Sequence, residues 1–308
     1  MESLNAYAGA RVAVTGASGY IGSVLAARLR RAGADVLAAD RSLLSAPSAA
    51  APLVDREVIF HLASNTSVRA AAADPGASVR ATVAPLRHLA AAARAHGHRP
   101  RVVLASTVTV YGVTDGCVDE RAVPAPATTY DAHKWEAEQV LAEATVDGVI
   151  DGVTLRIANV YGESPAPVSS ADRGFLNRAI ARALAGNDLS FYGDGAYVRD
   201  FIHVDDVASA LLAAGRVREP RARCFNVVTA IGTPMRDALE LIATTAARIT
   251  GRRVAVSGTE WPPDALPIDR RSFAGSNDRI RAELGWAPHI GLAEGIARTM
   301  ESSVQSCA

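Results

Sequence analysis

Short apolar runs alternate with longer alanine- and leucine-rich stretches over the first two thirds of the chain. The short runs have the length of buried strands, and the longer stretches have the length and spacing of helices. Strands that are apolar throughout and separated by helices are typical of a parallel sheet covered on both faces. We therefore predict an α/β fold with strands at 11–15, 36–39, 58–63 and 102–107, and helices ending near Ala32 and spanning 83–96, 133–146 and 175–185.

Composition agrees with a folded globular protein and excludes several function classes. Of 308 residues, 49% are apolar and 21% are charged, and 32 basic residues balance 32 acidic ones. This balance argues against a nucleic-acid partner or a polybasic membrane surface. No apolar run reaches the about 20 residues that cross a bilayer, and the first residues lack a signal-peptide pattern, so we expect a cytoplasmic location. Three scattered cysteines predict neither a disulfide framework nor a metal site.

A glycine-rich turn follows the first predicted strand. Gly16, Gly19 and Gly22 stand in the sequence Gly-Ala-Ser-Gly-Tyr-Ile-Gly, and a helical stretch comes next. Strand, glycine turn and helix in this order place the phosphates of a dinucleotide on backbone N–H groups at the helix N-terminus. We expect this turn, including Tyr20 and Ile21, to bind the cofactor.

The second predicted strand ends at Asp40, and Arg41 follows directly. An acidic residue about 20 positions beyond the glycines is where a ribose 2′-hydroxyl is held, which favours NAD(H). Arg41 could instead accept a 2′-phosphate, so NADP(H) stays open. Both residues are candidate cofactor contacts.

Tyr130 and Lys134 have the spacing Tyr-x-x-x-Lys. Residues four apart on a helix lie on one face, so the ammonium can sit near the phenol. A free tyrosine titrates near pH ~10, and a nearby positive charge lowers its pKa toward a range useful for proton exchange. The pair predicts a general acid or base beside a redox cofactor, although alone it also fits a half-exposed helix start with a solvated lysine.

Several segments resemble the extended short-chain dehydrogenase/reductases, and they occur in that family's order. They are the glycine turn, the strand 58–63, the strand 102–107 with the following Val-Tyr-Gly, and the Tyr-x-x-x-Lys pair. Segments 155–162, 192–207 and 284–288 are similar to the nucleotide-sugar epimerase/dehydratase branch. The resemblance implies a Rossmann-type doubly wound parallel sheet with a smaller C-terminal α/β substrate domain.

The resemblance also implies roles for individual residues. Tyr130 would be the catalytic acid/base, Lys134 would bind the nicotinamide ribose and lower the pKa of the phenol, and Thr107 would hydrogen-bond the reacting oxygen. Further cofactor contacts implied in this way are Leu62, Ala63 and Ser64.

Substrate contacts are implied in the same way. Asn159 and Arg199 correspond to residues that family members place on the diphosphate of a nucleotide sugar, and a guanidinium fork suits phosphate oxygens. The structural alternatives are a strand-end amide for Asn159 and an internal salt bridge from Arg199 to Asp200 or Asp205. The second arginine of the diphosphate site is expected at Arg271, or at its neighbour Arg270.

The chain departs from the family's pattern at three places. Segment 42–57 has room for barely one element where the family has a strand and a helix, so the adenine side of the cofactor pocket is expected to be more open. Thr82 replaces an asparagine of the proton relay behind the lysine. Val108 and Thr109 replace the Asp-Glu pair of the 4,6-dehydratases, which argues against dehydration.

Asp206 is expected to cap the helix that follows it.

Two enzymatic interpretations remain. One is a 4-ketoreductase that uses NADH or NADPH to reduce a nucleoside-diphosphate 4-keto-6-deoxysugar, with TDP the expected nucleotide; the other is an NAD-dependent 4-epimerase. Segments 128–139 and 171–174 are similar to deoxysugar ketoreductases, which favours the reductase. The intact Thr/Tyr/Lys set disfavours a third interpretation, a non-catalytic cofactor-binding scaffold.

The resemblance finally implies an organisation. Residues 1–163 would form the cofactor domain, with 199–230 folding back onto it, and 164–198 with 231–308 would form the substrate domain. Helices at 82–96 and 130–144 would pair with a second copy in a four-helix bundle, which gives a homodimer.

Overall fold

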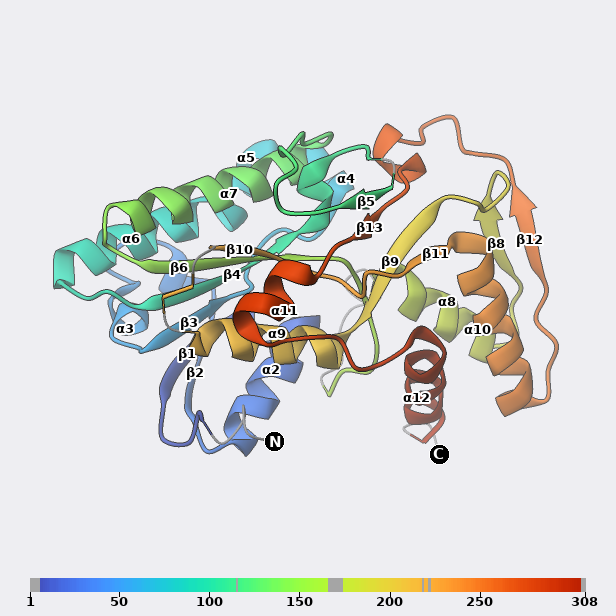
Figure 1. Ribbon diagram of the computed structural model, residues 1–308, viewed down its shortest axis with the longest axis horizontal. Helices are drawn as coiled ribbons and strands as arrows, with labels where there is room; N and C mark the ends of the chain where they lie inside the picture. Colours follow the sequence, from blue (N-terminus) through green and yellow to red (C-terminus); the bar gives the residue numbers. More distant parts are fainter. Residues whose placement is uncertain (1–5, 115, 166–173, 218, 221–222, 306–308) are drawn as a thin grey trace.

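The computed structural model describes residues 6–114, 116–165, 174–217, 219–220 and 223–305. Its largest unit is a six-stranded parallel sheet with strand order β10-β6-β4-β3-β1-β2 (Figure 1). The strands are β1 (Arg11–Thr15), β2 (Asp35–Ala39), β3 (Val58–His61), β4 (Arg101–Thr107), β6 (Asp151–Ile157) and β10 (Cys224–Val227). The predicted Rossmann-type parallel sheet is therefore confirmed.

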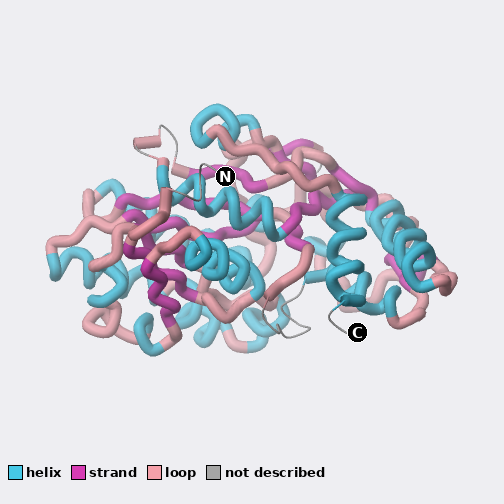
Figure 2. Tube along the Cα trace, turned by 90° about the horizontal axis from the view of Figure 1, so that it is seen from below, coloured by secondary structure: helices cyan, strands magenta, loops and turns pink. Residues whose placement is uncertain are grey.

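Helices cover both faces of this sheet because successive strand residues point to opposite sides. Val12 and Val14 of β1 belong to the core with helices α2 and α9, whereas Ala13 belongs to the core with α3, α6 and α7. Figure 2 shows helices on either side of the strands. These helices are α2 (Tyr20–Arg31), α9 (Val204–Arg216), α3 (Ala51–Val54), α6 (Ala84–His96) and α7 (Thr129–Val146).

Helix α7 begins before its predicted start at residue 133. Thr128 and Asp131 form a capping box, in which the Thr128 hydroxyl accepts the Asp131 N–H at 3.2 Å and the carboxylate accepts the Thr128 N–H at 3.1 Å. Reciprocal capping satisfies N–H groups that a helix start leaves unpaired. Tyr130 therefore lies in the first turn of the helix that carries Lys134.

A second group of elements gathers on the right of Figure 1 around its own apolar core. That core combines α8 (Gly174–Leu184), α10 (Met235–Thr250), α12 (Leu292–Gln305) and β8 (Leu189–Tyr192), which pairs with β12 (Val256–Thr259). A three-stranded sheet adjoins it, formed by β7 (Asn159–Tyr161), β9 (Val198–His203) and β11 (Gly232–Pro234). The remaining elements are α4 (Val68–Ala73), α5 (Pro75–Thr82), α11 (Asp278–Leu284), β5 (Cys117–Val118), β13 (Ala274–Gly275), and the 3₁₀ turns η1 (Ser42–Leu44), η2 (Val108–Tyr111) and η3 (Pro267–Arg270).

The connection from β2 to β3 is as short as the sequence predicts. It contains only η1 and the four-residue helix α3. Leu44 and Leu53 pack in the core that includes α6. Among the described residues β2 is the edge of the sheet, with no strand beyond it.

Two features of the described residues bear on function. No helix there is long and apolar enough to span a membrane. The same part of the chain contains no cluster of three or more His, Cys, Asp or Glu side chains arranged to hold a metal ion.

Candidate functional site

The glycine-rich turn at the C-terminal end of β1 forms a cradle for phosphate. Gly16 has a φ of +69°, and a Cβ at Gly22 would lie 2.1 Å from the Gly16 carbonyl oxygen, so a side chain at Gly22 would clash. Gly19 caps α2 without a side-chain hydrogen bond, and the first turn of α2 contains no acidic residue. The N–H groups and the positive end of the helix dipole are therefore suited to a pyrophosphate.

Two residues that the sequence analysis missed hold this turn against β3. The Thr15 hydroxyl oxygen accepts the N–H groups of Leu62 and Ala63, each at 3.1 Å, and lies 3.0 Å from Nδ1 of His61. Burial lowers the pKa of His61 to about 3, so its ring is neutral. In the sequence, the run His-Leu-Ala at the end of a buried strand was the only sign of this contact, because its partner Thr15 is distant in the chain.

Asp40 lies exposed just past the end of β2. Its Oδ1 accepts the Ser42 N–H at 2.8 Å and the Ser42 hydroxyl at 2.5 Å. These hydrogen bonds lower the pKa of Asp40, so the carboxylate is ionised and suited to accept ribose hydroxyls. Arg41, also exposed, caps η1.

Thr107 and Tyr130 come together between the end of β4 and the start of α7. Thr107 is buried, Tyr130 is partly buried, and Thr107 lies close enough to lower the pKa of the phenol. The Thr107 hydroxyl also accepts the Thr109 N–H at 3.2 Å and lies 3.0 Å from the Thr109 hydroxyl. The structure thus brings two of the three predicted catalytic side chains close to each other.

Lys134 is buried one turn further along α7. Its Nζ donates to the Ala105 carbonyl oxygen at 2.7 Å and to the Ser64 hydroxyl at 3.4 Å. Burial lowers the pKa of Lys134 to about 8, and the Glu138 carboxylate opposes that shift. The ammonium is therefore charged at neutral pH but can lose its proton in mild alkali.

The predicted lowering of the Tyr130 pKa by Lys134 does not occur in this structure. Burial raises the pKa of Tyr130 to about 12, the Asp131 carboxylate adds to that rise, and the nearby Thr107 side chain opposes it. Desolvation disfavours the phenolate more than Thr107 favours it. The phenol is consequently protonated at neutral pH.

A buried ion pair missed by the sequence analysis lies behind the lysine. Arg156 of β6 donates to Glu138 at 2.7 Å, and the Ser106 hydroxyl donates to the same carboxylate. Each side chain of the pair is only 5% exposed. This buried pair anchors the helix that carries Lys134 to β6.

Thr82 does not replace the missing relay asparagine directly. Its hydroxyl oxygen accepts the Asn65 N–H at 3.2 Å. The hydroxyl that accepts from the Lys134 ammonium is that of Ser64, at 3.4 Å.

Arg199 of β9 is buried among backbone carbonyl groups. Its guanidinium donates to the carbonyl oxygens of Val198 at 3.0 Å, of Asp269 at 2.6 Å and of Arg271, and it lies 5.0 Å from the centre of the Tyr197 ring. Burial lowers the pKa of Arg199 to about 9, and the positive charge of Arg271 adds to that effect. An arginine desolvated beside a second arginine is suited to an anionic ligand.

The salt-bridge alternative for Arg199 does not match these contacts. The Asp200 carboxylate instead accepts the Thr229 N–H at 2.8 Å, and Asp205 pairs with Arg28 at 2.6 Å. Asn159 does resemble a strand-end amide, since its Nδ2 donates to the Asp200 carbonyl oxygen at 2.9 Å.

The two candidates for the second arginine have different environments. Arg271 is partly buried, burial lowers its pKa, and its Nε is buried without a hydrogen-bond partner. Arg270 is exposed, with its guanidinium 4.8 Å from the centre of the Trp261 ring. Arg271 is therefore the more desolvated of the two cations, and only Arg271 has a buried N–H without a partner among the described residues.

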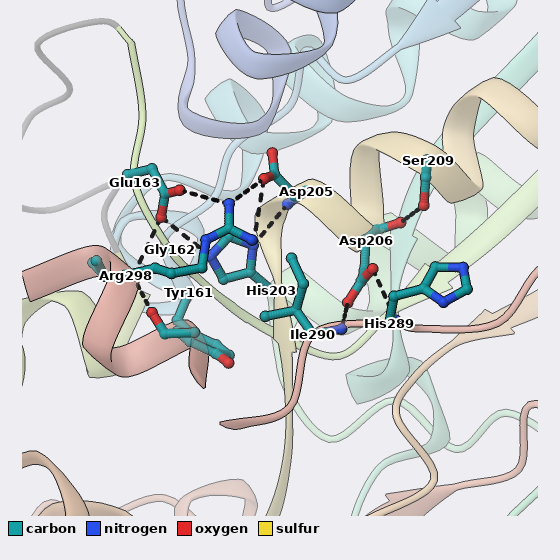
Figure 3. A network of polar contacts seen from close by, with 12 residues as sticks. Tyr161, Gly162, Glu163, His203, Asp205, Asp206, Ser209, His289, Ile290 and Arg298 are labelled. Carbon is teal, nitrogen blue, oxygen red and sulfur yellow. Dashed lines mark hydrogen bonds and ion pairs between the residues drawn. The ribbon is translucent and has the colours of Figure 1, made fainter. Parts of the chain in front are cut away.

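Asp206 has a different role from the one predicted. His203 is the residue that caps α9, because its Nδ1 accepts the Asp205 N–H. The Asp206 carboxylate accepts the N–H groups of His289 and Ile290 at 3.1 Å and 3.0 Å (Figure 3). It therefore fastens the segment that leads into α12.

Fold and site together define a dinucleotide-binding α/β protein with a threonine, tyrosine and lysine at the cofactor end of the sheet. The model of the NAD-dependent epimerase/dehydratase family matches residues 12–227. The chain therefore belongs to this family, a branch of the extended short-chain dehydrogenase/reductases.

Individual relatives include enzymes of two reaction types. The chain is 34% identical to a UDP-glucose 4-epimerase of Mycolicibacterium smegmatis, over 94% of this chain and 97% of the relative. It is 30% identical to a dTDP-6-deoxy-L-talose 4-dehydrogenase (NAD(P)⁺) of Kitasatospora kifunensis, over 93% of each. The solved structure of MoeE5 in complex with UDP-glucose and NAD superposes with a TM-score of 0.82 at 29% identity, over 97% of this chain and all of MoeE5.

Proposed function

We propose that the protein reduces the C4 ketone of a nucleoside-diphosphate 4-keto-6-deoxyhexose, with a thymidine nucleotide and with NADH or NADPH as the reductant. The observation that carries this proposal is the protonated Tyr130 phenol beside Thr107, since reduction of a ketone needs an acid at its oxygen. The reduced nicotinamide ring is uncharged and would leave the phenol protonated. The similarity to a 4-dehydrogenase that acts on a dTDP-6-deoxysugar supports the same direction.

The bound cofactor would supply the hydride to C4, and the protein supplies binding, orientation and the proton. The glycine turn from Gly16 to Gly22 would hold the pyrophosphate, and Lys134 would hold the nicotinamide ribose. Tyr130 donates its proton to the C4 oxygen while Thr107 orients that oxygen. Contacts expected beside these are the adenosine ribose on Asp40 and Arg41, the nicotinamide half on Leu62, Ala63 and Ser64, and the diphosphate on Asn159, Arg199 and Arg271.

The sheet is open at its β2 edge, beside the expected adenine site. This openness supports a cofactor that can exchange with solution, as a reductase requires. Beyond Asp40, the adenine side is bounded by the short turn η1 rather than by a further strand and helix. NADH is favoured over NADPH by the ionised carboxylate of Asp40 at the ribose position.

A 4-epimerase is the second candidate, and the 34% identity to a UDP-glucose 4-epimerase favours it. An epimerase uses Tyr130 first as a base, which requires that oxidised NAD⁺ lower the pKa of the phenol from about 12. The ketoreductase-like segment 171–174 includes residues outside those that the structure describes, so it adds nothing to the choice.

The absorbance of reduced nicotinamide tests both candidates. Purified protein is mixed with TDP-4-keto-6-deoxyglucose, with NADH and NADPH in parallel. Stoichiometric loss of absorbance is expected for the reductase. The cofactor that is oxidised faster, NADH or NADPH, shows which of the two the site at Asp40 accepts. No loss, together with tightly bound NAD released on denaturation and interconversion of UDP-glucose and UDP-galactose, would overturn the reductase and favour the epimerase.

The organisation into domains belongs to the same proposal. We assign 1–163 and 199–230 to the cofactor domain, and 164–198 and 231–308 to the substrate domain. Separate apolar cores around the parallel sheet and around α8, α10 and α12 support this division for most of the chain. Phe273, Ile280 and Trp286 depart from it, because they pack in the core of the parallel sheet.

A further inference from the structure

The Tyr20 side chain runs from the glycine-rich turn to the end of β7 and the start of α8. Its hydroxyl donates to the Gly162 carbonyl oxygen at 2.7 Å and accepts the side-chain amide of Asn177 at 2.9 Å. Tyr20 is the first residue of α2, Gly162 directly follows β7, and Asn177 lies in the first turn of α8. One hydroxyl group therefore joins three elements that are far apart in the chain.

Gly162 and Asn177 are also bonded to each other. The Gly162 N–H donates to the side-chain oxygen of Asn177 at 3.0 Å, and the Asn177 amide group donates to the Gly162 carbonyl oxygen at 3.1 Å. The Tyr20 hydroxyl has only one proton, and the Gly162 carbonyl oxygen takes it. Removal of that hydroxyl would therefore leave the contact between β7 and α8 in place and break only their link to α2.

This cluster of Tyr20, Gly162 and Asn177 is buried and closely packed. Tyr20 and Asn177 are each only 8% exposed, and the Tyr20 ring packs in an apolar cluster with Val204 at the start of α9. Gly162 has a φ of +124°, and a Cβ there would lie 2.7 Å from Nε2 of His203, which is drawn beside it in Figure 3. A buried and fully paired network of this kind holds its members in one arrangement.

The joined elements carry groups that the proposed function assigns to two different ligands. Tyr20 lies in the first turn of α2, whose backbone N–H groups have no acceptor inside the helix and would bind the cofactor pyrophosphate. β7 begins with Asn159, a proposed contact of the substrate diphosphate. Tyr20 thus connects the turn for one ligand to the strand for the other.

We propose that Tyr20 is a positioning residue that couples the two binding sites. Its hydroxyl holds β7 and α8 in place against the glycine turn, so that the cofactor and the substrate nucleotide each bind more tightly when the other is present. The ligand that binds first orders the shared cluster, and the second ligand then meets a lower entropic cost. The inference rests on the ligand sites of the proposed function and does not depend on the direction of the reaction.

Calorimetric titration measures this coupling without turnover. NADH is titrated into the full-length protein alone and again in the presence of saturating thymidine diphosphate. We expect the nucleotide to lower the Kd of wild-type protein for NADH by about fivefold or more, as is usual for coupled sites. Tyr20→Phe keeps the ring and loses the hydroxyl, so this factor should fall below about twofold while the Kd for NADH alone changes little.

Tyr7→Phe is the matched control. The Tyr7 hydroxyl also donates to a buried carbonyl oxygen, that of Leu212 at 2.8 Å, but both residues belong to the core of the parallel sheet. This variant should keep the wild-type factor.

Three results would overturn the proposal. They are a wild-type Kd for NADH that thymidine diphosphate does not change, a wild-type factor in Tyr20→Phe, and an equal loss of the factor in Tyr20→Phe and Tyr7→Phe. Wild-type protein that shows the coupling, loses it only in Tyr20→Phe and yet reduces no keto sugar would contradict the proposed reaction and support the role of Tyr20.

Discussion

The ammonium of Lys134 donates a 2.7 Å hydrogen bond to the carbonyl oxygen of Ala105, on the strand that ends with Thr107. This bond ties α7 to the end of β4 and fixes the lysine relative to the threonine. It also keeps the ammonium in a buried place, where its pKa falls to about 8.

That pKa predicts a limit to activity in alkali. As the pH rises through about 8, Lys134 loses its charge and with it the attraction for the ribose hydroxyls, so kcat/KM for the cofactor should fall. Lys134→Arg keeps a positive charge at all accessible pH values. Its kcat/KM for the cofactor should therefore not fall as the pH rises through this range, whatever its overall rate. A wild-type profile of kcat/KM that stays flat well above pH ~8 would contradict the assignment.

Removal of the phenol hydroxyl should abolish turnover. Tyr130→Phe is expected to lower kcat by about 10²- to 10⁴-fold, the usual contribution of a general acid, with NADH affinity nearly unchanged. Tyr7→Phe is the control, because its hydroxyl donates to the Leu212 carbonyl in the core and should affect unfolding but not kcat. Near-normal activity in Tyr130→Phe would remove Tyr130 as the acid.

The two neighbouring arginines should differ in their effect on substrate binding. Arg271→Ala is expected to lower kcat/KM for the sugar nucleotide about ten- to hundredfold, because charge-assisted bonds to a diphosphate are lost. Arg270→Ala removes a guanidinium stacked on Trp261 and should change the same quantity much less. The reverse ranking in a side-by-side kinetic assay would move the diphosphate site to Arg270.

A polar network joins the C-terminal helix to the sheet (Figure 3). Arg298 of α12 donates to Glu163 at 3.1 Å and to Asp205 at 2.9 Å, and Nε2 of His203 lies 3.2 Å from Glu163. The hydrogen bond to His203 lowers the pKa of Glu163 to about 2 from its ordinary 4.5. The depressed pKa means that Glu163 contributes stability above pH 4.5 and loses it as the pH falls toward 2.

Glu163→Gln should therefore lower the thermal midpoint at neutral pH. The difference from wild type should shrink as the pH falls below about 4.5, because the wild-type carboxylate then becomes protonated. Glu143→Gln, on the exposed side of α7, is the control and should show no such dependence. A difference in midpoint that is constant with pH would show that the network does not act through this charge.

The proposed homodimer would pack α6 and α7 against the same helices of a second copy. Ala142→Arg places a long charged side chain on the exposed side of α7 and should convert dimer to monomer. Light scattering distinguishes one chain of 32.1 kDa from twice that mass. Val304→Arg, on the exposed surface of α12, is the matched control and should not change the mass.

Much of the fold follows from local sequence because its signals are local. Runs of apolar residues mark the strands, and the spacing of Gly16, Gly19 and Gly22 marks a turn where backbone must approach closely. The Thr15–His61 and Glu138–Arg156 contacts had no such signal, since each joins residues that only the finished sheet brings together.

Ionisation was the least predictable property of the site. The spacing of Tyr130 and Lys134 correctly places both on α7, but it carries no information on how deeply each is buried. Burial reverses the expected sign of the Tyr130 pKa shift. The partners of Asp206 were missed for a related reason. A carboxylate near a helix start is interpreted from local sequence as a cap, whereas its actual partners, His289 and Ile290, are distant in the chain.

The edge position of β2 has a consequence for association between molecules. An uncovered strand edge exposes backbone groups with which another chain can pair. β2 is only five residues long, Asp40 follows it directly, and Asp35 at its start forms an ion pair with Arg56. The short length of β2 and the charges at both its ends disfavour pairing with a strand of another molecule. This edge is therefore protected against aggregation although no further strand covers it.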